Sequence, residues 1–152
     1  EIVNNISPLG FILGDEGSGA VLGKLLVGDV LKNQLPPAIK EAFLKQFDLT
    51  APEIIDRVYR QPFPNRFLAS LSPFLAQHLE ELAIRSLVLN SFIAFLRRNV
   101  MQYDYKQYPV HFIGSVAHCY KEILQEAAQT TGIQIGKILQ SPMEGLIQYH
   151  QQ

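Results

Sequence analysis

The segment GFILGDEGSGAVLGKLL, residues 10–26, joins an apolar stretch to an acidic, glycine-rich loop and then to the start of an apolar helix. Residues 9–13 predict a short strand, and Ser18 is a favourable N-cap for a helix that we expect to run to about Lys32. Strand, turn and helix in this order are typical of parallel α/β folds, which bind ligands where strands end and helices begin. The loop over residues 14–19 is therefore the first candidate site.

This loop places two carboxylates, Asp15 and Glu16, next to an exposed backbone. Carboxylates repel phosphate, so they are suited to accept hydrogen bonds from sugar hydroxyls or to hold the water shell of a metal. The backbone of Gly17, Ser18 and Gly19 leads into a helix N-terminus, where unpaired N–H groups favour an anion such as phosphate. A surface turn with solvated acids and a serine N-cap, without any ligand, explains the same residues.

Composition excludes several classes of partner. The chain has 152 residues, a size that fits one domain, and its 13 basic and 14 acidic side chains give a net charge of −1. No excess of positive charge is available for a nucleic acid, and no apolar run approaches the roughly 18 residues of a membrane span. We therefore expect a cytoplasmic protein without nucleic-acid or membrane partners. Because the chain begins at Glu1 without an initiator Met, we also expect a fragment of a longer protein.

The middle of the chain predicts helices. Helices are expected over residues 36–46 and over residues 65–80, the second with a kink or break at Pro73, and Thr50-Ala51-Pro52-Glu53 is a capping box. The clearest helix follows, marked by apolar residues at spacings of three and four: Ile84, Leu87, Val88, Ser91, Phe92, Phe95, Leu96 and Val100. We expect this all-helical part, about residues 36–105, to be a large insertion between two α/β units.

The C-terminal third predicts alternating strands and helices. Residues 110–114 have strand composition, a helix is expected from about Ala117 to Thr131 and ends at Gly132, and residues 133–139 are a second strand candidate. Ser141-Pro142-Met143-Glu144 has the N-cap, proline and glutamate of a further helix start. This order implies a parallel strand pair with a right-handed crossover. The fold class is therefore α/β, with short and mostly parallel strands.

Two further corners follow these predicted strands, at residues 114–118 and 140–144. Gly114 and Ser115 are small enough for a ligand to approach the backbone, and His118 lies at a helix start beside them. Phosphate could again be favoured by the helix N-terminus. The alternative at this corner is a plain strand end with Ser115 as an N-cap.

Several other residues have structural explanations. Cys119, the single cysteine, cannot form an intrachain disulfide, and we expect it to be a small buried side chain. We expect His78 to lie at the edge of the core and His111 within a strand. Gly23 and Gly28 each cost a helix roughly 1 kcal/mol relative to alanine, which predicts close packing against another backbone. These residues indicate neither a metal site nor a catalytic set.

Three motifs stand in a fixed order along nearly the whole chain. They are Gly14-Asp15-Glu16-Gly17-Ser18-Gly19 with Leu22-Gly23, then His111-Phe112-Ile113-Gly114-Ser115-Val116-Ala117, and finally Ser141-Pro142-Met143-Glu144-Gly145-Leu146. Together they resemble the C-terminal half of the N-acetylglucosamine kinase and BadF/BadG/BcrA/BcrD ATPase family. The resemblance implies that residues 1–152 are the C-terminal lobe of an actin-like, ribonuclease-H-like ATPase whose N-terminal lobe is absent here.

The resemblance also implies roles for the matching residues. Asp15 would contact an amino sugar, and Gly10 is the one residue kept from the family's sugar platform, where this chain has Ser7-Pro8-Leu9-Gly10. The candidates for contact with phosphate are Gly17, Ser18 and Gly19. The candidates for the nucleotide site are Gly114, Ser115 and Val116, with His118 beside them. Family members that activate dehydratases carry iron–sulfur clusters on cysteines that this chain does not have.

The family's first phosphate loop and catalytic aspartate belong to the N-terminal lobe and do not occur in this sequence. We therefore assign no catalytic residue and no metal ligand, and we expect this chain alone to be inactive. The resemblance implies that the full-length parent is an ATP-dependent amino-sugar kinase that uses ATP and magnesium. The alternative is a nucleotide-binding regulatory or interaction module of the same superfamily. A homodimer formed through the helical insertion is a further expectation.

Overall fold

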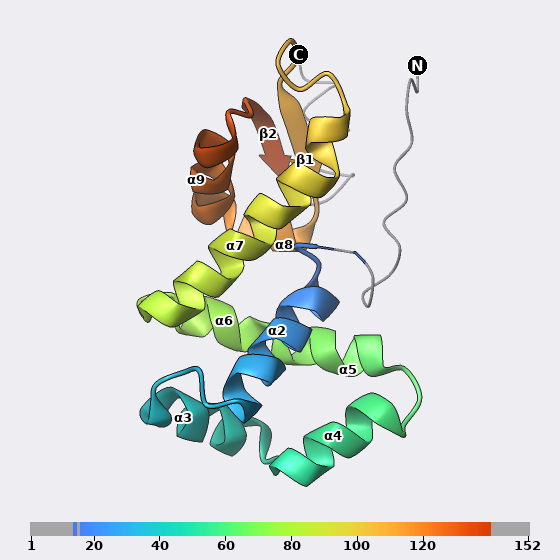
Figure 1. The fold of residues 1–152 in the computed structure, drawn as a ribbon, viewed down its shortest axis with the longest axis vertical. Helices are drawn as coiled ribbons and strands as arrows, with labels where there is room; N and C mark the ends of the chain where they lie inside the picture. The colour runs from blue at the N-terminus through green and yellow to red at the C-terminus, as the bar shows by residue number, and fades with distance from the viewer. Residues whose placement is uncertain (1–13, 15, 141–152) are drawn as a thin grey trace. The chain divides into compact units, whose positions relative to one another are not determined.

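The computed structural model describes residue 14 and residues 16–140 (Figure 1). The described residues fall into two compact units, residues 14–88 and residues 89–140. Each unit is described by itself below. The strand predicted at residues 9–13 and the helix start predicted at residues 141–144 lie outside the described residues.

The first unit begins with α2 (Gly19–Leu31), where the sequence predicts a helix. The Val21 N–H donates to the Oγ atom of Ser18 over 3.2 Å, so Ser18 is the N-cap that we expected. Its apolar residues Leu22, Leu26 and Val30 are completely buried. The first turn carries no acidic side chain and the last turn no basic one, so capping and burial hold this helix without help from charges at its ends.

The predicted helices of the middle segment are present. They are α3 (Pro37–Phe47), α4 (Ala51–Tyr59), α5 (Pro64–Leu71), α6 (Pro73–Gln77) and α7 (Leu82–Arg98). Pro73 separates α5 from α6, because proline has no N–H for the helix to use. The capping box is complete, since the Thr50 side chain and the Glu53 side chain each accept from the other residue's backbone N–H. Val100, the last residue of the predicted stripe, lies beyond α7 in the short 3-10 helix η1 (Val100–Gln102).

The helices α2 and α5 cross in this unit (Figure 1), and at Gly23 their backbones come close together. A Cβ atom on Gly23 would overlap the backbone carbonyl of Leu68. The expectation of close backbone packing is therefore confirmed for Gly23. It is wrong for Gly28, because nothing lies within 4 Å of the position that a Cβ would take there.

An aromatic cluster extends the core of the same unit. The rings of Phe43 and Phe74 meet edge to face with their centroids 5.3 Å apart, and both side chains are completely buried. The His78 ring lies 4.1 Å from the Phe74 ring and is half-buried. The placement of His78 at the edge of the core is therefore confirmed.

The second unit contains a parallel strand pair, β1 (Val110–Ile113) and β2 (Ile135–Leu139). Two helices, α8 (Ser115–Cys119) and α9 (Lys121–Thr131), connect the strands. Gly132 ends α9 with a φ of 77°, a left-handed conformation that glycine adopts without strain. The predicted parallel pair and the glycine stop are both confirmed.

The sequence-based prediction of one helix from Ala117 to Thr131 is wrong in two respects. The helical segment begins earlier, at Ser115, and it is divided at Tyr120, whose φ of −110° and ψ of 31° are not helical. This break lets the Tyr120 side chain become buried with its ring 6.0 Å from that of Phe92. Cys119 was expected to be buried but is exposed, because Tyr120 rather than Cys119 points into the core.

The pairing of β1 with β2 contains a bulge. Val110 pairs with Ile135 and Phe112 with Ile138, so His111 faces the two residues Gly136 and Lys137. The Lys137 N–H donates to Nδ1 of His111 over 2.8 Å. The His111 side chain thus satisfies a backbone donor at the bulge, and a Cβ on Gly136 would overlap its ring.

None of the described helices has the length and apolar character that a membrane-spanning segment requires. The proposal that residues 36–105 form an insertion stays a prediction.

We predict that Gly23→Ala lowers the free energy of unfolding by about 1–3 kcal/mol, because the added methyl forces α2 and α5 apart. Gly28→Ala is the matched control, since its methyl would meet open space and should stabilise the helix by about 0.5–1 kcal/mol. Urea titrations followed by circular dichroism measure both changes. Equal effects at the two glycines would contradict the close crossing.

We predict a pH-dependent gain in stability from Asp29→Asn. Burial raises the pKa of the Asp29 carboxyl above its usual range, so ionised Asp29 destabilises the native state at neutral pH. Its position in the last turn of α2, near the negative end of the helix, adds about 0.3–1 kcal/mol to that penalty. The advantage of the variant should be full at pH 7 and should disappear as the pH falls below about 3.9, the carboxyl value in the unfolded chain.

Urea titrations at several pH values measure this difference. Asp104→Asn, at an exposed site outside the helices, is the matched control and should leave stability unchanged. A gain from Asp29→Asn that does not change with pH would contradict a titrating origin.

Candidate functional site

The first candidate corner lies between Gly14 and the start of α2. Gly14 is buried, Glu16 and Gly17 form a turn, and Ser18 caps the helix. Gly17 has a φ of 80°, which side chains other than glycine rarely adopt, so this glycine is required by the turn itself. Gly10 and Asp15, the two residues expected to contact a sugar, lie outside the described residues.

The Ser18 side chain already accepts from the Val21 N–H, so the capping explanation of this serine is confirmed. Capping leaves the positive end of the α2 dipole in place, since no acidic side chain lies in the first turn. A Cβ added at Gly19 would lie 3.6 Å from the Cβ of Ala69 and 3.6 Å from the Oγ of Ser72, an ordinary contact distance. The proposed contact of residues 17–19 with phosphate stays a prediction.

The second candidate corner is the turn that follows β1. Gly114 has a φ of 140° and a ψ of 160°, a conformation open essentially only to glycine. Its N–H donates to the Leu139 carbonyl over 2.8 Å, and its carbonyl accepts from the His118 N–H over 3.1 Å. The turn is therefore tied to β2 on one side and to α8 on the other.

Ser115 was one alternative for the N-cap of the helix at this corner, and that expectation is wrong. Gly114 is the N-cap, no side chain caps α8, and Ser115 is its first helical residue. Because the Gly114 N–H is bound to β2, the chain enters the helix one residue earlier than a serine cap would allow. The Ser115 side chain is consequently exposed and is not used for capping.

The remaining residues of this corner are Val116 and His118, both half-buried. The Nδ1 atom of His118 is buried and has no hydrogen-bond partner among the described residues. A buried ring nitrogen without a partner is costly, and such groups call for an explanation. His118 therefore stays a candidate for the nucleotide site on the basis of this observation as well as its position.

The structure thus brings Gly114, Ser115, Val116 and His118 together in one turn. Residues 16–19 form the other corner, which belongs to the first unit. The proposal that the two corners line a single cleft stays a prediction.

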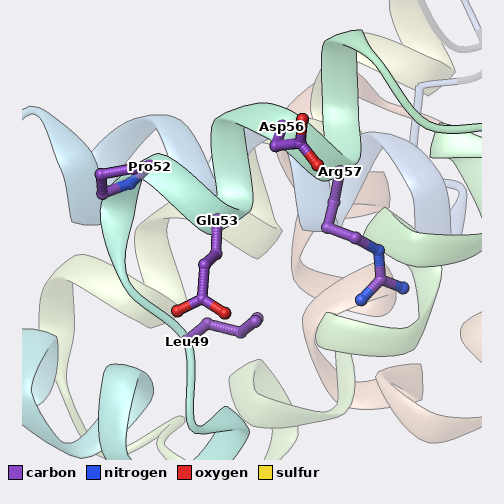
Figure 2. Close-up of a pocket in the computed structure, with 5 residues that line it drawn as sticks. All are labelled: Leu49, Pro52, Glu53, Asp56 and Arg57. Atoms are coloured by element: carbon purple, nitrogen blue, oxygen red, sulfur yellow. The ribbon is translucent and has the colours of Figure 1, made fainter.

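The described residues contain hollows that the sequence motifs did not indicate. One of about 320 Å³ lies beside α4 and is lined by Leu49, Pro52, Glu53, Asp56 and Arg57 (Figure 2). Another of about 830 Å³ lies along α3 and is lined by Asn33, Leu35, Pro37, Lys40, Glu41, Leu44 and Lys45. Neither includes a residue of the predicted site.

Within residues 16–140, no three His, Cys, Asp or Glu side chains are grouped so that they could hold a metal ion. A magnesium ion of a nucleotide complex is bound largely by phosphates and water, so it needs few protein ligands. The binding of a nucleotide at the described corners stays a prediction. At Gly114 the position of a Cβ has nothing within 4 Å, and an exposed serine hydroxyl follows it.

No family model matches the chain, and no curated protein sequence matches it. Among solved structures, it is similar to the "Putative N-acetylglucosamine Kinase" of Porphyromonas gingivalis, with 59% sequence identity and a TM-score of 0.93 over 99% of this chain. This chain covers 53% of that protein, so it spans about half the length of its relative. The similarity confirms the resemblance to N-acetylglucosamine kinases that the three motifs indicated.

We predict that Gly114→Ala lowers the free energy of unfolding by about 1–3 kcal/mol. Space is available for the methyl, so the loss would come from backbone strain alone. The control is Gly132→Asn, because asparagine tolerates the left-handed conformation found at residue 132 and should cost about 1 kcal/mol or less. Thermal unfolding measures both variants. A neutral Gly114→Ala would show that this turn does not require glycine.

Proposed function

We propose that this chain is the C-terminal lobe of an ATP-dependent amino-sugar kinase with an actin-like, ribonuclease-H-like fold. The observation that carries the proposal is the 59% identity, over 99% of the chain, to a protein with the name of an N-acetylglucosamine kinase. The parallel strand pair with its connecting helices supports the fold, because ligand sites of parallel α/β proteins lie at such strand ends.

In this proposal the turn after β1 binds the nucleotide. The backbone of Gly114 lets the ligand approach closely, and the exposed Ser115 hydroxyl is available as a donor or acceptor. Val116 contributes an apolar contact, and His118 offers a ring nitrogen. Because Gly114 is bound to the Leu139 carbonyl, β2 holds this turn in position before the nucleotide arrives.

The corner before α2 binds the amino sugar and faces phosphate. Asp15 would accept hydrogen bonds from sugar hydroxyls, and Gly10 would belong to the sugar platform, as the resemblance implies. The backbone of residues 17–19 and the positive end of α2 favour negative charge on the transferred phosphoryl group. When bound, ATP supplies that group and magnesium neutralises its charge.

Catalysis requires more than these two corners. Phosphoryl transfer depends on positioning of the terminal phosphate and on a base that accepts the proton of the sugar hydroxyl. We assign both tasks to the N-terminal lobe of the full-length parent, since this chain covers 53% of its relative. The partners of the chain are accordingly ATP, an amino sugar and the N-terminal lobe, and the parent acts in the cytoplasm.

We predict that the 152-residue chain shows no turnover in a coupled assay with ATP, magnesium and N-acetylglucosamine or glucosamine, whereas the full-length parent does. Asp15→Asn in the parent should raise the KM for the sugar at least tenfold, because one charged hydrogen-bond acceptor is lost. Glu16→Gln is the matched control, as it changes the neighbouring carboxylate in the same way. Clear turnover by the chain alone would contradict the assignment of catalysis to the N-terminal lobe.

A thermal-shift screen of the parent distinguishes the two functions under consideration. Ligands that bind only the native state raise its apparent stability. Shifts with both a nucleotide and an amino sugar support the kinase. A shift with nucleotides alone, together with no turnover, supports the nucleotide-binding regulatory module.

A further inference from the structure

The His111 side chain makes a contact that the proposed nucleotide site does not use. This residue lies in β1, three positions before Gly114, and its side chain is exposed. Its Nδ1 atom nevertheless accepts from the Lys137 N–H of β2 over 2.8 Å. An exposed histidine has water as an alternative partner, so the binding of its ring to the backbone of a neighbouring strand needs a reason.

The contact lies where the register of the two strands changes. The pairing passes from Val110 with Ile135 to Phe112 with Ile138, so β2 advances by three residues while β1 advances by two. The resulting bulge takes the Lys137 N–H out of the ladder, and the imidazole ring supplies the acceptor that the ladder does not. The histidine side chain therefore holds the extra residue of β2 in place.

Gly136 makes room for the imidazole ring. Glycine weakens the interior of a strand, because it has no side chain to pack. Gly136 does not have a positive φ, so its backbone conformation does not require glycine. A Cβ at this position would overlap the Cε1 and Nδ1 atoms of His111. The glycine and the histidine are therefore matched across the two strands.

The same contact assigns the state of the imidazole. A ring nitrogen accepts a hydrogen bond only when it carries no proton, so the bond from Lys137 assigns the proton of a neutral ring to Nε2. Asparagine carries an acceptor oxygen on Cγ, the atom to which Nδ1 is attached in histidine, whereas alanine offers no acceptor. An asparagine at residue 111 can therefore replace the histidine in this one respect.

The register beyond the bulge decides which atoms hold the Gly114 turn. Ile113 pairs with Leu139, and the Gly114 N–H donates to the Leu139 carbonyl over 2.8 Å. Without the extra residue of β2, the same N–H would meet the Ile138 carbonyl instead. A shift of one residue also turns every side chain of a strand to the opposite face. The bulge thus sets the position of the turn that presents the Ser115 hydroxyl.

The packing of β1 on α7 does not set this register. The Phe112 ring lies 6.2 Å from that of Phe95, which joins β1 to the helix. No residue of β2 takes part in this ring contact, and apolar contacts have no directional preference. The hydrogen bond between His111 and Lys137 is directional, and it joins the two strands at the bulge itself.

We propose that His111 is a positioning residue of the nucleotide site. Its neutral imidazole holds the bulge of β2, and the bulge in turn places the Gly114 turn where the nucleotide binds. The ring does not touch the nucleotide. This inference rests on the proposed function of that turn. Because the corner proposed for the sugar belongs to the first unit, the effect should fall on ATP and not on the sugar.

Steady-state kinetics of the full-length parent test the proposal. His111→Ala should raise the KM for ATP about fivefold, because the Lys137 N–H loses its acceptor, and should leave the KM for the sugar within about twofold. His111→Asn keeps an acceptor and should return the KM for ATP toward the wild-type value. Gln134→Ala, which removes an exposed side chain next to β2, is the matched control and should change neither KM.

Amide hydrogen exchange at Lys137, followed by NMR in the same variants, tests the bond itself. We expect exchange to be roughly tenfold faster in His111→Ala than in the wild type, because the N–H is released to water. Exchange in His111→Asn should stay close to the wild-type rate. This measurement does not depend on turnover.

Several results would overturn the proposal. A folded His111→Ala parent with an unchanged KM for ATP excludes the positioning role and leaves the kinase function intact. An equal rise in the KM for ATP and for the sugar would indicate a general loss of structure instead. Unchanged exchange at Lys137 in His111→Ala would show that the ring does not hold the bulge. A wild-type parent that neither turns over nor binds ATP would overturn the proposed function, and this inference with it.

Discussion

The first unit depends on the contact between Gly23 of α2 and the Leu68 carbonyl of α5. With no side chain at residue 23, the two backbones meet directly, and the leucines of both helices are buried in the same unit. The start of α2 is set locally, by the Ser18 cap and by the left-handed Gly17 before it.

In the second unit, a short parallel strand pair holds a turn whose backbone conformation would strain any residue except glycine. Two hydrogen bonds are decisive: the Gly114 N–H donates to the Leu139 carbonyl, and the Lys137 N–H donates to the His111 ring at the bulge. Both join residues far apart in the chain, so the turn after β1 exists only once β2 has paired. If this turn binds a nucleotide, its binding is coupled to the integrity of the sheet.

Each unit contains one of the two candidate corners. One corner has small residues and backbone N–H groups before a long helix, and the other has an exposed hydroxyl after a strained glycine. This division agrees with a chain that spans 53% of its kinase relative, and it makes the proposed function a property of the longer protein.

Local interactions made much of this structure predictable from sequence. The caps Ser18 and Thr50, the prolines that begin α3 to α6 and the stop at Gly132 act within a few residues, so sequence alone determined where these helices begin and end. The motifs also located the turn after β1. Tertiary contacts decided the rest. Gly23 and Gly28 are both helical glycines, and only the position of Leu68 gives them opposite roles. The break at Tyr120, the exposure of Cys119 and the cap at Gly114 depend on partners distant in the chain, which no local pattern specifies.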